Sequence, residues 1–261
     1  MESNMTLANN EFKVEIIKTG EAEVPAPEVY WMQGWEAWEK LSFHMVLAYN
    51  EKRNFLINTG LPLDLKERNA AMIEFAGKRS IFIPNKRTED LLLERNLRCD
   101  EIQNVSFTPI QDYTTGRLDL FGRARIFISK KGWIEDIVSP NYSKHLPRSL
   151  FIPDKILGYL IFNAWERVSL VDAPERVSLI PGIEMLWVGC HHRSSVAFII
   201  NTKEGRVIFT DCSFKSKNIE KRIPIGIAEN TLECLDAYEI LSNLGRVLPA
   251  YDPEIDELSI G

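Results

Sequence analysis

Hydrophobic and polar positions are arranged along the chain in short runs that predict strands, several of them paired as hairpins. The apolar runs His44–Tyr49 and Asn54–Asn58 are separated by four polar residues, which predicts a β-hairpin. Val196–Asn201 and Arg206–Thr210 predict a second hairpin, because Gly205 between them can adopt the positive φ of a tight turn. Further strands are expected at 13–18, 106–107, 125–129, 184–188 and 246–249.

Helical segments lie between these strands. Helices are predicted over 88–95, 131–138, 155–165 and 231–241. Asn230 or Thr231 can cap the last of them, and Gly245 follows its end. Residues 139–180 contain Pro140, Pro147 and Pro153 and interrupt the strand pattern, so they are expected to form a helical insertion or lid. Hairpins with interspersed helices predict one α/β domain over residues 1–261, with mixed, mainly antiparallel sheets.

Composition narrows the class of protein. The chain has 261 residues, of which 45% are hydrophobic and 26% charged, so it can bury a core without disulfides or metal. A net charge of −6 argues against nucleic acid or an anionic membrane as partner. The four cysteines form no C-x-x-C pair and the first residues are polar, which predicts reduced thiols in the cytoplasm. The longest apolar stretch is too short to span a bilayer.

Five short segments follow one another in a fixed order: NTG at 58–60, TPIQDYTTG at 108–116, GCHH at 189–192, TD at 210–211 and AYDP at 250–253. In this order they resemble the metallo-β-lactamase superfamily, and within it the hydrolases similar to N-acyl homoserine lactonases. The corresponding family segments read D-T-G, H-x-H-x-D-H-x-G-G, G-H-T-x-G, a metal-bridging Asp, and G-H-D-P. The resemblance implies a four-layer αββα sandwich.

The resemblance also implies where a dinuclear metal site would lie. The positions of the five family histidines are occupied by other residues, whereas both aspartates, Asp112 and Asp211, are kept; the replacements are Thr108, Ile110, Tyr113, Cys190 and Tyr251. Zinc sites of this type need imidazole and carboxylate ligands. We therefore expect no zinc and no cofactor. The alternative is one hard divalent or ferric ion held by Asp112 and Asp211 with phenol oxygens.

Two carboxylates in a metal-free pocket cannot both ionise easily unless cations or hydrogen-bond donors compensate them. One carboxyl could take a proton, Arg193 or a lysine could pair with the two groups, or Tyr113 and Tyr251 could donate hydrogen bonds to them. Asp112, Asp211, Tyr113 and Tyr251 would then form either an acid–base site with shifted pKa values or a structural polar network.

Cys190 and His191 offer a second candidate chemistry. His191 could act as a general base or activate the Cys190 thiol as a nucleophile. The alternative is a small buried hydrophobic residue beside loop histidines. Residues expected to line the pocket are Thr108, Ile110, His192, Arg193 and Phe214. Asn58 replaces the family Asp that supports a metal ligand, whereas His44 and His145 have no partners at ligand spacing.

Two apolar features have no assigned partner. Trp31, Trp35 and Trp38 have helical spacing, which indicates a packing stripe, a substrate-binding wall or a dimer contact. The apolar segment 150–165 would cover the pocket or pack against a second subunit. The resemblance implies that such an insertion serves dimerisation or acyl-chain binding.

Three functions follow as hypotheses. The first is a pseudoenzyme, a non-hydrolytic protein that binds a small ligand or regulates through it. The second is a metal-independent Asp/Tyr enzyme for a small carbonyl metabolite, and the third is a lactone or ester hydrolase with a single atypical metal. Under each hypothesis the expected partner is a small molecule, and neither nucleic acid nor a membrane is expected. A homodimer is possible under all three.

Overall fold

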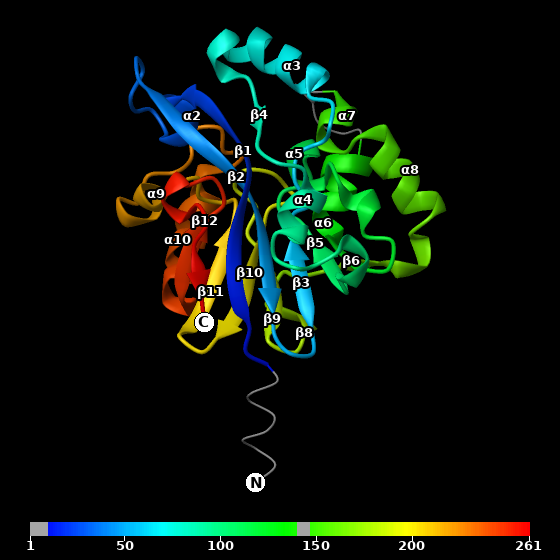
Figure 1. Cartoon of the computed structure of the whole chain (residues 1–261). Coiled ribbons are helices and arrows are strands. Elements are labelled where there is room, and N and C mark those ends of the chain that lie inside the picture. Colours follow the sequence, from blue (N-terminus) through cyan, green and yellow to red (C-terminus); the bar gives the residue numbers. More distant parts are fainter. Residues whose placement is uncertain (1–9, 140–146) are drawn as a thin grey trace.

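The computed structural model describes residues 10–139 and 147–261, so His145 lies outside the described residues. Two β-sheets face each other, and helices cover their outer faces (Figure 1). The first sheet has the order β13-β1-β2-β3-β5-β6-β7, with β4 paired to β1, and the second has the order β12-β11-β10-β9-β8. This arrangement confirms the four-layer sandwich.

The first sheet is built from β1 (Lys13–Pro25), β2 (Trp38–Tyr49), β3 (Asn54–Ile57), β4 (Ile83–Pro84), β5 (Asn104–Ser106), β6 (Arg125–Ser129), β7 (Val168–Val171) and β13 (Ser259–Ile260). The second contains β8 (Val177–Ile180), β9 (Ile183–Trp187), β10 (Val196–Thr202), β11 (Gly205–Thr210) and β12 (Arg246–Pro249). Antiparallel pairs predominate, whereas β3-β5-β6-β7 and β11-β12 run parallel. The mixed, mainly antiparallel character is therefore confirmed.

The α-helices are α2 (Ala26–Val29), α3 (Lys66–Ala76), α4 (Thr88–Leu93), α5 (Asp112–Thr115), α6 (Lys130–Gly132), α7 (Arg148–Phe151), α8 (Asp154–Phe162), α9 (Ser216–Glu220) and α10 (Thr231–Leu244). Short 3-10 turns are η1 (Lys78–Ser80), η2 (Cys99–Glu101), η3 (Leu118–Leu120), η5 (Trp165–Arg167) and η6 (Pro253–Ile255), and η4 (Trp133–Val138) is a π-helical turn. No helix among residues 10–139 and 147–261 is long and apolar enough to cross a membrane.

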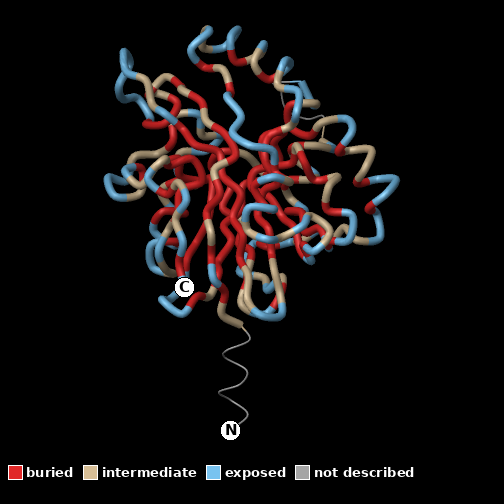
Figure 2. The backbone as a smooth tube through the Cα atoms, viewed as in Figure 1, coloured by how far each residue is buried: buried red, intermediate tan, exposed pale blue. Residues whose placement is uncertain are grey.

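The first sheet is covered on both faces, which explains its continuous apolar runs. Val46 and Ala48 of β2 face the second sheet, whereas Met45 and Leu47 belong to the core beneath α4 and α8. This alternation is the two-residue period of a strand. The buried backbone is concentrated in the central strands, and α3 at the top of the view is mostly exposed (Figure 2).

Both predicted hairpins are confirmed, with Tyr49 opposite Asn54 and Thr202 opposite Gly205. The cap of α10 is confirmed as well, since the Asn230 side chain accepts hydrogen bonds from the backbone N–H groups of Leu232 and Glu233.

The helix expected over 131–138 is confirmed, as α6 followed directly by the π-helical turn η4. Two other local expectations were wrong. Residues 139–180 do not interrupt the strands throughout, because β7 and β8 complete the ends of the two sheets. Trp31 and Trp35 do not form a helical packing stripe: they lie in turns, 50% and 69% exposed, because Met32 and Gly34 adopt positive φ.

The connectivity brings the five motif segments to one edge of the sandwich. The carboxyl ends of the parallel strands β3 and β5 lead into segments 58–60 and 108–116. Those of β11 and β12 lead into 210–211 and 250–253. Because parallel strands end at the same edge, four of the motifs meet there, and the β9–β10 connection supplies the fifth.

Candidate functional site

Asp211 is the hydrogen-bonded centre of this edge. Its carboxylate is fully buried and accepts hydrogen bonds from Thr108 Oγ1 and Ser195 Oγ, each at 2.5 Å. His191 Nδ1 lies 3.2 Å from the second carboxylate oxygen. Two motif loops are therefore tied to this one side chain, the second motif loop and the β9–β10 connection, and the carboxylate oxygens are satisfied by donors from the protein itself.

Asn58 makes a similar connection at the end of β3. Its side-chain oxygen accepts from the backbone N–H of Thr108 at 3.0 Å, and its amide donates to the carbonyl of His44 at 3.0 Å. An amide can do both, whereas an ionised carboxylate in its place could only accept. Asn58 thus supports the second motif loop directly.

Asp112 is paired with Arg68 of α3. The Arg68 Nη2 lies 2.5 Å from Asp112 Oδ1, and Nε lies 3.0 and 3.2 Å from the two carboxylate oxygens. The same guanidinium donates to Gln111 Oε1 and to the carbonyl of Leu150. Both partners are nearly completely buried. Burial raises the pKa of the Asp112 carboxyl, and the guanidinium opposes that rise by favouring the charged form.

Aromatic rings enclose this ion pair. The Arg68 guanidinium lies 5.4 Å from the ring centres of both Phe82 and Tyr113. Tyr113 Oη lies 3.2 Å from Tyr251 Oη, so the two phenols bond to each other. Burial raises the pKa of each phenol, which keeps both protonated at neutral pH. The sequence-based expectation that these phenols donate to the aspartates is not what the contacts show.

The two histidines of the GCHH segment lie side by side, with ring centres 4.1 Å apart. His191 packs against Phe214 and Tyr251, and burial lowers its pKa to about 4, so the ring is neutral at physiological pH. His192 is partly buried, with Nε2 3.3 Å from Gln111 Nε2. His191 therefore acts in this arrangement as a donor to Asp211.

Cys190 faces away from the histidines. Its thiol is fully buried, donates to the carbonyl of Val188 at 3.3 Å, and lies beside Cys212 and Cys234 in the core between the sheets and α10. Burial raises the pKa of the Cys190 thiol, which disfavours the thiolate that a nucleophile needs. All four cysteines are free.

This environment predicts the order of thiol reactivity. Iodoacetamide added to the folded protein should label Cys99, which is partly exposed, and leave Cys190 unmodified, as measured by peptide mass spectrometry. In denaturant all four cysteines should react, which is the internal control. Rapid labelling of Cys190 in the folded protein would revive the nucleophile hypothesis.

Arg193 does not compensate the aspartates, contrary to the expectation from sequence. Its guanidinium pairs with Glu229, just before α10, at 2.8 Å and with Glu233, in the first turn of α10, at 2.5 Å. It also lies over the Trp187 ring, 5.2 Å from the ring centre. Arg68, rather than Arg193, supplies the cation for Asp112.

The donor set does not fit the two metal ions that the resemblance implies. Ile110 belongs to the apolar core beneath α4, and Thr108 is engaged with Asp211. Both phenols stay protonated, and a positive guanidinium already neutralises Asp112. No group of three or more His, Cys, Asp or Glu side chains in the described part of the chain is arranged to hold a metal ion. A single ion shared by Asp112 and Asp211 is not supported either. Asp112 is paired with Arg68, whereas Asp211 is hydrogen-bonded to Thr108, Ser195 and His191.

The predicted site residues are thus brought together but enclosed. His192 and Arg193 are partly exposed. The other predicted site residues are buried: Thr108, Ile110, Asp112, Tyr113, Cys190, His191, Asp211, Phe214 and Tyr251. The sequence analysis missed Arg68, Gln111 and Ser195. Ser195 lies close to the GCHH segment and Gln111 lies inside the second motif, so their positions in the sequence could have identified both. Arg68 lies in a charged helix that gives no sign of an inward-facing side chain.

Comparison with known proteins identifies the fold. No family model and no curated protein sequence matches the chain. Among solved structures, an N-acyl homoserine lactone hydrolase with N-hexanoyl-L-homoserine at its catalytic metal centre matches with a TM-score of 0.73 and 15% identity, over 93% of this chain and 94% of that one. A probable metal-dependent hydrolase from Staphylococcus aureus matches with a TM-score of 0.72 and 14% identity, over 93% and 90%. A hydrolase of the β-lactamase superfamily matches with a TM-score of 0.65 and 11% identity, over 95% and 89%. The chain therefore has the four-layer metallo-β-lactamase-like fold.

Proposed function

We propose that this protein is a non-hydrolytic relative of the lactonase-like hydrolases, which binds a small ligand or regulates through that binding. The observation that carries the proposal is the engagement of both motif aspartates by the protein itself: Asp112 by Arg68, and Asp211 by Thr108, Ser195 and His191. Carboxylates held in this way serve as structural connections between loops.

The acid–base alternative is less well supported. General acid–base catalysis needs a side chain within hydrogen-bond reach of the substrate and a pKa near the working pH. Both carboxylates are nearly inaccessible, and the raised pKa of each phenol keeps it from accepting a proton.

Metal content and turnover test the proposal together. The purified, tag-free protein is analysed by inductively coupled plasma mass spectrometry, as isolated and after incubation with Zn²⁺, Mn²⁺ and Fe²⁺. We expect far less than one metal ion per chain, and hydrolysis of N-hexanoyl homoserine lactone and 4-nitrophenyl acetate at the rate of buffer alone, with or without EDTA.

The controls separate the three hypotheses. Turnover that EDTA abolishes, in protein with about one metal ion per chain, would establish the single-metal hydrolase. Turnover that resists EDTA but is lost in Asp112→Asn, Asp211→Asn or Tyr251→Phe would establish the acid–base enzyme. Turnover retained in all three variants would identify a contaminant.

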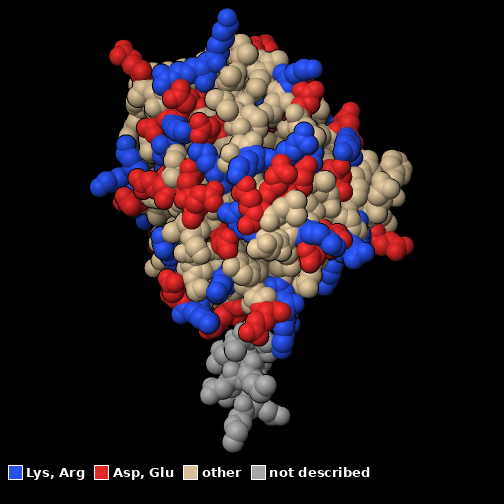
Figure 3. Space-filling model, viewed as in Figure 1, with Lys and Arg blue, Asp and Glu red and all other residues tan. Residues whose placement is uncertain are grey.

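The charge on one face of the molecule is mixed. On the face shown in Figure 3, lysine and arginine side chains are interspersed with aspartate and glutamate, so this face has no continuous basic area for nucleic acid. A homodimer and a cytoplasmic location belong to the same proposal, and the mass of the particle in solution tests the first of them.

A further inference from the structure

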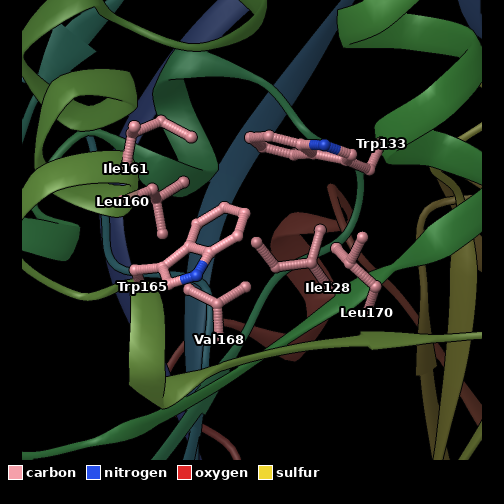
Figure 4. Close-up of a pocket in the computed structure, with 7 residues that line it drawn as sticks. All are labelled: Ile128, Trp133, Leu160, Ile161, Trp165, Val168 and Leu170. Atoms are coloured by element: carbon pink, nitrogen blue, oxygen red, sulfur yellow. The ribbon is translucent and has the colours of Figure 1, made fainter.

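An apolar cleft lies on the face of the first sheet that is turned away from the second sheet, between α8, η4, η5 and the edge strand β7. It has a volume of about 280 Å³. Trp133 and Trp165 approach it from opposite sides, Ile128 forms its floor, and Ile161 and Leu170 lie at its margins (Figure 4). All the lining side chains are uncharged and apolar.

The backbone that presents Trp133 is unusual. Trp133 opens the π-helical turn η4, in which the N–H of Ser139 bonds to the carbonyl of Ile134 five residues earlier. π-Helical turns are rare and occur frequently at functional sites. The turn is held in place because Asp136 accepts a hydrogen bond from the backbone N–H of Ser194 at 2.8 Å.

The same contact joins the cleft to the motif loops. Ser194 Oγ accepts from the backbone N–H of Ile110 at 2.9 Å, so η4, the β9–β10 connection and the second motif form one chain of hydrogen bonds. Gly132, just before the turn, allows the close approach, since a Cβ there would lie 2.3 Å from Ser194 Cα. A molecule that displaces Trp133 would therefore act on the loop that carries Asp112.

The size and chemistry of the cleft indicate its occupant. Ligand cavities for drug-sized molecules usually measure about 300–1,000 Å³, so this cleft suits a smaller molecule of one or two rings. Two indole rings, which Figure 4 shows inclined to each other, favour a flat aromatic ring over a branched aliphatic group, because aromatic rings pair both by offset stacking and edge to face. Neither indole N–H donates a hydrogen bond within the described residues, so each can serve a single oxygen acceptor on the ligand.

We propose that this cleft is the ligand site of the protein and that it takes an uncharged aromatic molecule of one or two rings with one hydrogen-bond acceptor. Its status as the physiological ligand site rests on the function proposed above; binding by the cleft does not. Trp165 is 66% exposed and Leu170 47% exposed, so an occupant would remove apolar surface that now faces water.

The test uses 6-propionyl-2-(dimethylamino)naphthalene, an uncharged two-ring compound with one carbonyl and a fluorescence that shifts to the blue in apolar surroundings. Titration of the full-length protein should give saturable, one-to-one binding. Ile161→Arg should weaken binding about tenfold or more, because the guanidinium enters the cleft margin. Phe162→Arg is the matched control: its side chain is 84% exposed on the same helix and does not line the cleft, so binding should be unchanged.

Leu170→Arg, on β7, repeats the test from a second element in case Ile161→Arg does not fold. Thermal unfolding confirms that each variant is folded. Equal binding by wild type, Ile161→Arg and Leu170→Arg would overturn the proposal, as would absence of saturable binding. Displacement of the probe by 1-decanol but not by 2-naphthol would overturn the aromatic assignment.

The hydrolysis assays run on the same preparations keep this proposal distinct from the proposed function. If the protein hydrolyses a substrate and Ile161→Arg also weakens probe binding, the non-hydrolytic function is refuted and the ligand site in the cleft stands. Absence of both turnover and binding would refute the cleft and leave the non-hydrolytic function standing.

Discussion

Replacing Arg68 with methionine should lower the free energy of unfolding by about 3–5 kcal/mol, as is typical when one member of a buried ion pair is removed. The Asp112 carboxylate would stay buried without its cation, and Gln111 Oε1 and the carbonyl of Leu150 would each lose a donor. Urea denaturation followed by circular dichroism measures the change. Without the guanidinium that opposes the effect of burial, the pKa of the Asp112 carboxyl rises further, so the deficit in stability should increase with pH.

Two comparisons make the Arg68 experiment specific. In Arg68→Met/Asp112→Asn the uncompensated charge is gone, so the double variant should be more stable than Arg68→Met alone. Arg79→Met removes an exposed guanidinium that pairs with Glu23 and should leave stability nearly unchanged. If the effects of Arg68→Met and Asp112→Asn simply add, the two side chains are not coupled and the ion pair does not hold the site.

His191 should make the protein sensitive to acid. Its pKa is about 4 in the folded protein and about 6.5 when unfolded. Between these values the unfolded chain binds more protons, so stability is fully present above pH 6.5 and falls as the pH drops toward 4. The loss from this one side chain should reach about 3 kcal/mol.

The comparison for His191 is His191→Gln, whose amide can still donate to Asp211 but does not titrate. Urea unfolding of both proteins at several pH values between 4 and 7 isolates the contribution, since the other titrating groups are common to the two. The variant should lose less stability over this range. Parallel curves for the two proteins would show that His191 is not buried in its neutral form.

The fold could be predicted because its signals are local. Each hairpin needs only a strand, a turn residue and a second strand, and the order of the five motif segments fixes how the strands are connected. The exceptions also have local causes. β7 and β8 are short and separated by segment 172–176, which obscures their pattern, and positive φ at Met32 and Gly34 breaks the helix that the tryptophan spacing indicated.

The positions of the site residues could be predicted, whereas their partners could not. Motif order places Asp112, Asp211 and both tyrosines at one edge, but the partners are chosen by tertiary packing. Arg68 reaches Asp112 across 44 residues of sequence, from a helix whose other charged side chains face water. Tyr113 and Tyr251 bond to each other because burial favours the protonated phenols.

The Arg68–Asp112 pair also affects any attempt to introduce a metal site at this edge. Histidines introduced at 108, 110, 113, 190 and 251, the positions that hold them in the family, would place metal ligands beside a buried guanidinium. Two unit positive charges about 4 Å apart repel by about 4 kcal/mol at an effective dielectric constant of 20, and a divalent ion would be repelled more strongly. A divalent ion could therefore bind beside Asp112 only in a variant that lacks Arg68, and removing Arg68 costs stability. The arginine thus opposes any single substitution that would build a metal site at this edge.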